Sequence, residues 1–363
     1  MNIGIDARMI EHSGIGVRLQ NILSGLTEYS QNKYYLFGDP QQLKKFPFSR
    51  YFQIIDYQAP VYSLSEFWGH PQMANMDLLD IPHFNIPLRY INKCLVTIHD
   101  IIPFVQRQYH SSLAKKLYFF LVMFAIKHFA RKVITVSDYT RKDLVEHLDF
   151  NKNDLITIPN AVSGKIYRKG SAEKIRQFRK KMHLPADYLL TVGIGKEHKN
   201  LVFLLRCLGY LWDSGKFKNT LVIAGSRGKA PDYARAMIEK YKKYIMILPE
   251  LSAEEFPLVY QSAKVLIYPS LYEGFGFPVL EAQSSGCPVV SSDRSVLPEI
   301  LLDSALLFNP QSEKDCLMAL SRFFNDKKLA AKLVSMGLAN AKRFSWEVSV
   351  RKIIDIYHAY SAH

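Results

Sequence analysis

Cysteine is scarce in this chain of 363 residues, and none of its four cysteines lies near another in the sequence. Without a CxxC pair, the spacing typical of a zinc site or a redox-active disulfide is missing. Each cysteine lies in an apolar stretch, so we expect small buried hydrophobic residues and a reducing, cytoplasmic compartment. The four are Cys94, Cys207, Cys287 and Cys316.

Long hydrophobic runs are absent as well. The longest, residues 117–126, is much shorter than the ~20 residues that a membrane-spanning helix needs. Asp6 and Arg8 interrupt the N-terminal segment, so we expect no signal peptide there. Basic residues flank the apolar run, which predicts either a buried core helix or a helix lying on an anionic membrane surface. The flanking residues are Lys115, Lys116, Lys127, Arg131 and Lys132.

Acidic residues are too few to balance the basic ones, since 33 Asp and Glu stand against 47 Lys and Arg, a net charge of +14. This excess predicts an anionic partner: nucleic acid, an anionic membrane surface or a phosphorylated ligand. Basic and aromatic residues do not alternate along one exposed stretch, which argues against nucleic acid. Seven basic residues crowd into residues 168–181, which we interpret as a linker and the first helix of a second domain.

Strands and helices alternate twice along the chain. The first round predicts strands at 2–7, 34–37, 53–56, 94–98 and 132–136, and a glycine turn at 13–16 before a helix at 17–29. The second predicts strands at 188–192, 220–224, 244–248, 265–268, 288–291 and 305–308. Helices are expected between them, at 200–212, 232–241, 253–261, 278–285 and 312–324. We therefore predict an α/β protein with two doubly wound, Rossmann-like domains facing a central cleft, at 1–166 and 167–345, and a helix at 346–363 that crosses back to the first domain.

The most informative stretch is the loop that follows the strand predicted at 265–268. Gly274 and Gly276 permit a tight turn and a close approach of the backbone to a ligand. Pro278 suits the first turn of a helix, where its missing N–H is not needed. The successive N–H groups of residues 274–277, at a helix start, therefore predict an anion-binding site.

Glu273 and Glu281 bracket this loop. On one helix they would lie ~12 Å apart along the axis, whereas a retaining glycosidase needs ~5–5.5 Å between its two carboxyls. Each glutamate is better suited to a different part of a long polar ligand: Glu281 to vicinal hydroxyls and Glu273 to a hydroxylated ring beyond the phosphates. The alternative is purely structural, with Glu273 opening the loop and Glu281 pairing locally, but the glycines and the preceding strand favour function.

Residues 273–282, followed by 286–290, resemble the E-x7-E signature of the retaining nucleotide-sugar glycosyltransferases of family 4, the glycosyl transferases group 1, which have the GT-B fold. The resemblance extends along nearly the whole chain, and its opening is similar to bacterial mannosyltransferases of surface-polysaccharide pathways. The further matching segments are 4–8, 13–16, 97–100, 135–137, 158–162, 199–201, 221–225 and 297–299.

The resemblance implies a role for each matching residue. Glu281 would bind the ribose of the donor, Lys199 its diphosphate, and Glu273 the donor sugar, while His99 would contact that sugar near the reacting carbon. The family often carries a basic residue where Ile194 and His198 stand here, and Lys196 between them is a candidate substitute. The predicted catalytic residues are thus His99, Glu273 and Lys199; the predicted donor-binding residues are Gly14, Gly16, Lys196, Gly274, Phe275, Gly276, Phe277 and Glu281.

The resemblance implies an acceptor-side first domain and a nucleotide-sugar-binding second domain. The basic excess fits an acceptor on an anionic membrane, so we expect a cytoplasmic protein that is peripheral on the inner face of the membrane, with residues 117–126 and 168–181 as the candidate contacts. The reaction would move a sugar, with GDP-mannose as the first guess and UDP-hexoses next, to a hydroxyl of a glycan or lipid-linked acceptor. No metal is expected, because the chain has no Asp-x-Asp triplet, and no cofactor beyond the donor as co-substrate. The alternative is a nucleotide-sugar-binding or membrane-surface scaffold that has lost turnover, suggested by Ile194 and His198. A dinucleotide-binding function is weakly supported, because Leu19 stands where a third glycine would complete the fingerprint.

Overall fold

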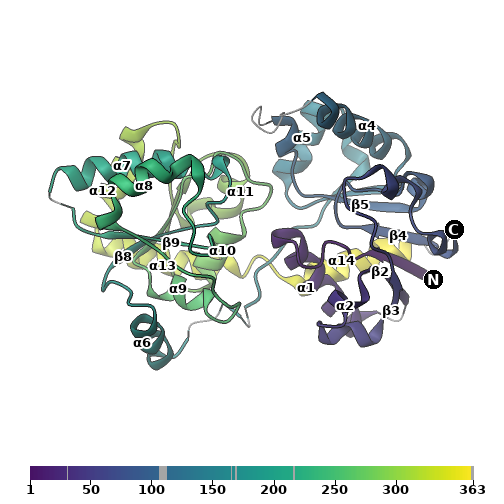
Figure 1. Cartoon of the computed structure of the whole chain (residues 1–363), viewed down its shortest axis with the longest axis horizontal. Coiled ribbons are helices and arrows are strands. Elements are labelled where there is room, and N and C mark those ends of the chain that lie inside the picture. The colour runs from purple at the N-terminus through teal and green to yellow at the C-terminus, as the bar shows by residue number, and fades with distance from the viewer. Residues whose placement is uncertain (31, 106–112, 165, 168–169, 216, 361–363) are drawn as a thin grey trace. The chain divides into compact units, whose positions relative to one another are not determined.

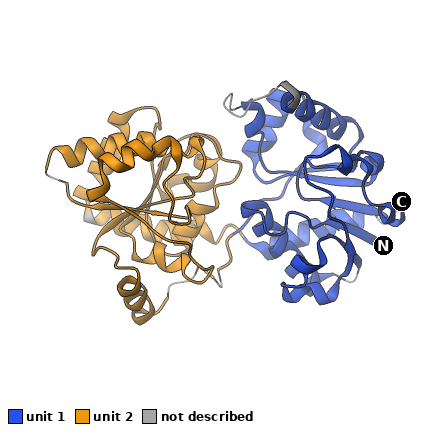
Figure 2. Ribbon diagram, in the orientation of Figure 1, with its two compact units in different colours: residues 1–161, 345–363 blue, residues 162–344 orange. Residues whose placement is uncertain are grey.

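The chain forms two compact units in the computed structural model, which describes residues 1–30, 32–105, 113–164, 166–167, 170–215 and 217–360 (Figures 1 and 2). Unit 1 consists of Met1–Ala161 and Ser345–His363, and unit 2 consists of Val162–Phe344. The divisions fall at 161/162 and 344/345, compared with the 166/167 and 345/346 expected from the sequence.

Unit 1 is built on a parallel sheet of seven strands among the residues described, in the order β3-β2-β1-β4-β5-β6-β7. The expected strands form, but β4 and β7 were not predicted. β4 is interrupted by a charged residue, Asp80, and β7 is only three residues long. The bounds are β1 (Asn2–Asp6), β2 (Lys33–Gly38), β3 (Gln53–Asp56), β4 (Leu78–Ile81), β5 (Cys94–Ile98), β6 (Lys132–Thr135) and β7 (Leu155–Thr157).

The first helix of unit 1 corrects one expectation. Helix α1 (Ser13–Tyr29) already includes residues 13–16, so the predicted glycine turn is instead its first turn. A Cβ at Gly16 would overlap the backbone carbonyl of Ile10, so only glycine lets the helix start this close to the preceding loop. The other helices of unit 1 are α2 (Pro40–Leu43), α3 (Ile102–Val105), α4 (Leu113–Phe129), α5 (Asp138–Leu148) and α14 (Trp346–Ala359).

Helix α14, at the end of the chain, is part of the core of unit 1. Val350 packs against Gly25 of α1 so closely that a Cβ on that glycine would lie 2.6 Å from a Val350 methyl carbon. The Ser349 hydroxyl donates to the carbonyl of Pro159 at 2.7 Å, and the buried Tyr357 hydroxyl donates to the carboxylate of Asp80 in β4. The last helix is therefore fixed to the centre of the sheet by a buried polar contact.

Burial raises the pKa of Asp80 to about 6, although the Tyr357 hydrogen bond and the charge of Arg18 lower it. An unfolded aspartate titrates near ~3.9, so the stability that Asp80 contributes is complete below about pH 4 and is lost as the pH rises through about 6. We expect Asp80→Asn to abolish this dependence. The free energy of unfolding of the wild type, relative to the variant, should fall by ~2–3 kcal/mol between pH 4 and pH 7 in urea titrations; parallel profiles for the two proteins would contradict the assignment.

Unit 2 repeats the architecture, with six described strands in a parallel sheet of order β10-β9-β8-β11-β12-β13. Its strands lie within about a residue of the predicted ones, because their apolar runs are continuous and bounded by turn residues. They are β8 (Tyr188–Val192), β9 (Thr220–Ala224), β10 (Ile245–Ile247), β11 (Val265–Tyr268), β12 (Val289–Ser292) and β13 (Leu306–Phe308). The predicted fold class, two doubly wound Rossmann-like domains, is confirmed.

Helices cover both faces of the sheet of unit 2. Among them, α11 and α13 were not predicted. Helix α6 carries the described part of the basic run 168–181, of which Arg168 and Lys169 lie outside the described residues. The bounds are α6 (Ala172–Lys181), α7 (Leu201–Asp213), α8 (Arg235–Lys240), α9 (Phe256–Ser262), α10 (Phe277–Ser284), α11 (Leu297–Leu301), α12 (Glu313–Asn325) and α13 (Lys327–Ala341).

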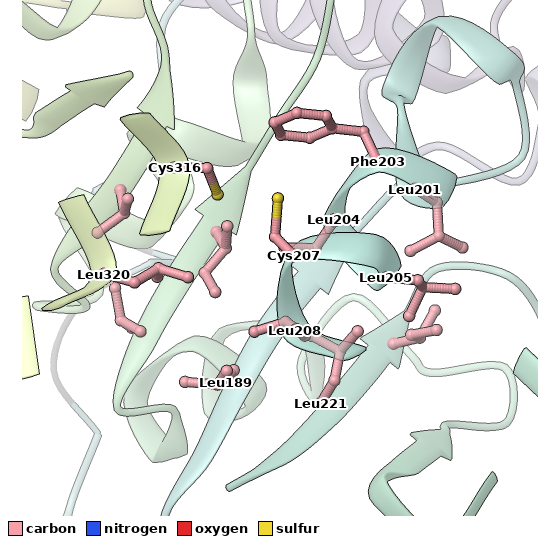
Figure 3. Close-up of a cluster of buried hydrophobic side chains, with 14 of the residues drawn as sticks. Leu189, Leu201, Phe203, Leu204, Leu205, Cys207, Leu208, Leu221, Cys316 and Leu320 are labelled. Carbon is pink, nitrogen blue, oxygen red and sulfur yellow. The ribbon is translucent and has the colours of Figure 1, made fainter. Parts of the chain in front are cut away.

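The core of unit 2 lies between helices α7 and α12 and the sheet. Cys207 on α7 and Cys316 on α12 point their sulfur atoms toward one another among leucine side chains (Figure 3), and a thiol hydrogen bond joins them. The prediction of small buried residues is confirmed, because all four cysteines are free and buried. Of the helices in the described ranges, none combines the length and the apolar character required to span a membrane.

Candidate active site

The candidate site of unit 2 lies where its strand order reverses, between β8 and β11. In doubly wound sheets, ligands bind at the carboxyl ends of the strands at this switch point. The loops after the two strands are joined by a hydrogen bond from the Leu271 N–H to the His198 carbonyl, at 2.8 Å. Asn200 has a left-handed backbone with φ +58°, and its side-chain amide donates to the carbonyls of Pro269 (3.2 Å) and Pro310 (2.9 Å). The position of the preceding residue, Lys199, is therefore well defined.

Lys199 and Glu273, two of the predicted catalytic residues, are in direct contact. The Lys199 Nζ lies 2.7 Å from the Glu273 Oε1 and 2.8 Å from the Tyr268 hydroxyl, which in turn donates to the same Oε1 at 2.7 Å. The lysine and glutamate side chains are only 16% and 10% exposed. Tyr268, at the end of β11, was missed because a tyrosine in an apolar strand is typical of a core residue.

Electrostatics keep the Glu273 carboxylate ionised. Burial raises the pKa of Glu273, but the charge and hydrogen bond of Lys199 and the hydroxyls of Ser270 and Tyr268 outweigh it, so the pKa is lowered overall. Burial and the Glu273 charge raise the pKa of Tyr268 far above neutrality, so its hydroxyl remains a donor. A ligand anion at this place would share the ammonium of Lys199 with Glu273.

The loop between Glu273 and α10 forms the helix start that the sequence predicts. Gly276 has φ +87°, a left-handed conformation that favours glycine, and Pro278 occupies the first turn. The ring of Phe275 packs edge-on against Phe277 and Phe344, with centroids 5.2 and 5.7 Å away, which fixes the loop. Because the first N–H groups of a helix have no intrahelical acceptor, this start presents donors and the positive end of the helix dipole.

Glu281 lies one turn inside α10 and is held by a different set of groups. The Tyr260 hydroxyl donates to its Oε2 at 2.8 Å, and the Tyr167 hydroxyl also bonds to this carboxylate. Burial raises the pKa of Glu281, while the two tyrosine hydrogen bonds lower it. Neither tyrosine was predicted as a site residue, because Tyr260 has the spacing of a core residue and Tyr167 precedes the basic run.

The positions at which the family often carries a basic residue provide no positive charge here. Ile194 is part of the hydrophobic core. Burial, together with the charges of Lys199 and Lys196, lowers the pKa of His198 to about 4, so its imidazole is neutral at pH 7. Lys196 is exposed, and its carbonyl accepts the N–H of Lys199.

His99, Gly14 and Gly16 belong to unit 1. His99 follows β5 and is mostly buried, with its Nε2 3.0 Å from the carbonyl of Pro82. That bond requires a proton on Nε2, which leaves Nδ1 as an acceptor. Burial and the nearby His83 lower the pKa of His99 well below its ordinary value, so it is neutral. His83 was not singled out in the sequence; its ring centroid lies 6.0 Å from that of His99.

Gly14 and Gly16 of unit 1 differ in whether the backbone N–H donates a hydrogen bond at the start of α1. The N–H of Gly16, one of the predicted donor-binding residues, donates to the carbonyl of His12, the residue before α1. Gly14 precedes that first intrahelical bond and lies in the first turn of α1. Within the described ranges, no three His, Cys, Asp or Glu side chains lie close enough together to hold a metal ion.

Comparisons with known proteins agree with this architecture. The sequence model of the family described as "Glycosyl transferases group 1" matches residues 173–339, and that of "Glycosyltransferase Family 4" matches residues 70–163. The chain is similar to sucrose-phosphate synthase from Thermosynechococcus elongatus, with a TM-score of 0.78 and 18% identity over 100% of this chain and 99% of that one. It is also similar to Anabaena HepE in complex with UDP-glucose, with a TM-score of 0.78 and 16% identity over 99% and 100% of the two chains.

Among curated proteins, the chain is 29% identical over 278 residues to O-antigen chain mannosyltransferase B of Escherichia coli, covering 76% of this chain and 72% of that protein. It is 31% identical over 246 residues to the O-antigen chain mannosyltransferase RfbU of Salmonella typhimurium, covering 67% and 64%. It spans 35% of the length of another relative, the serotype-specific mannosyltransferase WbdA of Escherichia coli.

Two parallel Rossmann-like domains of this kind define the GT-B class of glycosyltransferases. The chain belongs to glycosyltransferase family 4, the glycosyl transferases group 1. The family resemblance predicted from the sequence is thereby confirmed.

The buried ion pair yields a stability prediction. Lys199→Met leaves the Glu273 carboxylate buried without its cation, so we expect a loss of ~3–5 kcal/mol in the free energy of unfolding. The double variant Lys199→Met/Glu273→Gln should recover much of this loss. Lys181→Met, which breaks the more exposed pair with Glu255, is the control and should cost less than ~1 kcal/mol. Urea unfolding of the three variants tests this prediction. If Lys199→Met were as stable as the wild type, the Lys199–Glu273 ion pair would contribute nothing to stability.

Proposed function

We propose that this glycosyltransferase moves mannose from GDP-mannose to an acceptor hydroxyl, with retention of anomeric configuration, in the synthesis of a surface glycan. The observation that carries the proposal is the Lys199–Glu273–Tyr268 cluster, which lies at the start of α10 and at the switch point of the sheet. Similarity to proteins named as O-antigen mannosyltransferases supports the choice of sugar and acceptor class.

In this proposal, unit 2 holds the donor. The diphosphate of the donor interacts with Lys199 and with the N–H groups of residues 274–277, where a cation and a helix dipole act together. Lys196, exposed on the neighbouring loop, adds a second positive charge. Glu281 accepts hydrogen bonds from the ribose, and Glu273 contacts the sugar.

The proposed chemistry is mainly electrostatic. As the bond between the sugar and the diphosphate breaks, negative charge builds up on the phosphate oxygen, and Lys199 with the helix start stabilises it. The acceptor oxygen then bonds to the anomeric carbon on the face from which the diphosphate departs, so the configuration is retained. The departing phosphate takes the proton that this acceptor hydroxyl loses. The proposal includes no metal ion and no cofactor beyond the donor. It keeps His99 as a residue that contacts the sugar, as the family resemblance implies.

Substitution of the two glutamates separates their roles. Glu281→Ala should raise the Kd for the donor ~10–100-fold, because each lost hydrogen bond to a charged group is worth ~1.5–3 kcal/mol. Glu273→Ala should mainly lower kcat. Thermal shifts with GDP-, UDP-, ADP- and dTDP-sugars identify the donor, since a ligand at 100 times its Kd stabilises the fold by ~2.7 kcal/mol. Unchanged donor binding by Glu281→Ala would exclude the ribose assignment.

A second candidate is a nucleotide-sugar-binding scaffold without turnover. It is favoured by the core position of Ile194 and by the neutral imidazole of His198, which leave the diphosphate fewer cations than is common in the family. Transfer of radiolabelled sugar from any nucleotide donor to a glycan or lipid pool would exclude this alternative.

We also propose that unit 1 contacts an anionic membrane surface through helix α4. This second proposal does not depend on the donor site. One face of α4 is buried, through Phe119, Val122 and Ile126. The opposite face is apolar and exposed, and we call it the α4 outer face: Leu117, Phe120, Leu121 and Phe124, each more than half exposed. Such a face with lysines at both ends suits the interface of an anionic bilayer.

The helix is held rigidly enough to present this face. The Tyr118 hydroxyl donates to the Glu66 Oε1 at 2.6 Å, and its ring stacks on Phe67 with the centroids 5.6 Å apart. Glu66 is buried and also lies 3.4 Å from the guanidinium of Arg8, which pairs with Asp6. The outer face is exposed, while Tyr118 anchors α4 to the segment that carries Glu66 and Phe67.

Vesicle binding tests this contact. The wild type should co-sediment with vesicles containing phosphatidylglycerol and much less with pure phosphatidylcholine. Leu121→Ser/Phe124→Ser should weaken binding at least ~10-fold, because each apolar side chain that loses its burial contributes ~1.5–3 kcal/mol. Met318→Ser, at an exposed apolar residue of unit 2, is the matched control and should bind like the wild type. Binding that does not depend on anionic lipid would exclude the proposal.

A further inference from the structure

The carboxylate of Glu281 is held by two phenol groups that carry no charge. Tyr260, on α9, donates to the Oε2 at 2.8 Å, and Tyr167, in the segment before α6, bonds to the same carboxylate. The two rings lie with their centroids 6.2 Å apart. A carboxylate offers about four lone-pair positions, so two remain for a ligand.

The direction of these bonds is fixed by the environment of the tyrosines. Tyr260 is fully buried, and its ring packs against Phe256 with the centroids 5.9 Å apart. Burial and the Glu281 charge raise the pKa of both tyrosines, so each remains protonated and each donates. Two donors without charge orient the carboxylate but do not neutralise it, unlike the lysine beside Glu273.

We propose that Tyr260 and Tyr167 are positioning residues that leave Glu281 two lone pairs for the vicinal hydroxyls of a ribose, so that the chain selects ribonucleotide over 2′-deoxyribonucleotide donors. This inference rests on the proposed function, in which Glu281 binds the ribose. A 2′-deoxyribose leaves one of the two lone pairs without a donor in a partly buried site, and an unsatisfied acceptor there weakens binding.

The same arrangement sets the pH range of binding. Glu281 accepts from two hydroxyls only when it is ionised. The titratable groups that face it are Tyr260 on α9, Tyr167 before α6 and, further away, Tyr268 on β11. Removing a phenol removes a hydrogen bond that favours the ionised form, so the pKa of Glu281 rises. Binding of the nucleotide is then lost at a higher pH than in the wild type.

The experiment measures the affinity of the full chain for GDP and 2′-deoxy-GDP, and for UDP and 2′-deoxy-UDP, by calorimetry from pH 5 to pH 8. The wild type should prefer the ribonucleotide at least ~10-fold at pH 7.5. In Tyr260→Phe and Tyr167→Phe, the pH at which binding is half lost should rise by about one unit, and the preference for ribose should fall several-fold.

Tyr188→Phe is the matched control. Tyr188 is also buried, and its hydroxyl donates to the Val259 carbonyl of the same helix α9 at 2.6 Å, but it does not bond to Glu281. This variant loses a buried hydrogen bond of similar kind, so it should keep the pH profile and the ribose preference of the wild type.

The outcomes distinguish a failure of the inference about the tyrosines from a failure of the proposed function, in which Glu281 binds the ribose. If Glu281→Gln loses the ribose preference and Tyr260→Phe and Tyr167→Phe behave like Tyr188→Phe, the tyrosines are only structural and the inference is wrong. If Glu281→Gln binds all four nucleotides like the wild type, or if none of them binds the wild type, the ribose assignment in the proposed function fails, and the inference fails with it.

Discussion

The ion pair between Lys199 and Glu273 is the interaction on which the site in unit 2 depends. It joins the loop after β8 to the loop after β11, and Tyr268 bonds to both of its members. Neither charge is exposed enough to be stabilised by solvent alone, so each requires the other. The loops are held in register by the left-handed Asn200, whose amide bridges two carbonyls. A cation is thus kept ready at the switch point by a counter-charge that belongs to the same site.

The two glutamates of one short motif are placed in opposite electrostatic environments. Glu273 lies beside an ammonium group, and its pKa is lowered overall although burial raises it. Glu281, one turn into α10, has two neutral phenols as its partners, and burial raises its pKa. Groups whose environments differ in this way are suited to different parts of a ligand. Glu273 is suited to the part of a ligand whose charge changes during the reaction, and Glu281 is suited to a neutral diol.

The fold was largely predictable from the sequence because buried parallel strands are continuous apolar runs. β4 escaped notice because Asp80 interrupts its run. That aspartate is accommodated by two residues far away in the sequence, since Tyr357 donates to it and the charge of Arg18 lies nearby. Residues 13–16 were predicted as a turn because two close glycines usually mark one. In the structure, Gly16 instead allows the first turn of α1 to lie against the backbone of Ile10. The contact of Lys199 with Glu273 was not predictable from spacing, and Tyr268, Tyr260 and Tyr167 could not be distinguished from core residues. Pairing between distant segments is decided by the tertiary fold alone.

The discontinuity of unit 1 in the sequence has a consequence for biosynthesis. Its sheet is complete at Thr157, but Tyr357, which donates to Asp80, comes 277 residues after Asp80. A nascent chain leaving the ribosome therefore exposes an aspartate in the middle of an otherwise apolar strand until Tyr357 has been translated. Unit 2, whose residues are contiguous, is able to fold first. Premature termination anywhere before α14 leaves the earlier-made unit without its closing helix, and such truncated products are natural targets for proteolysis.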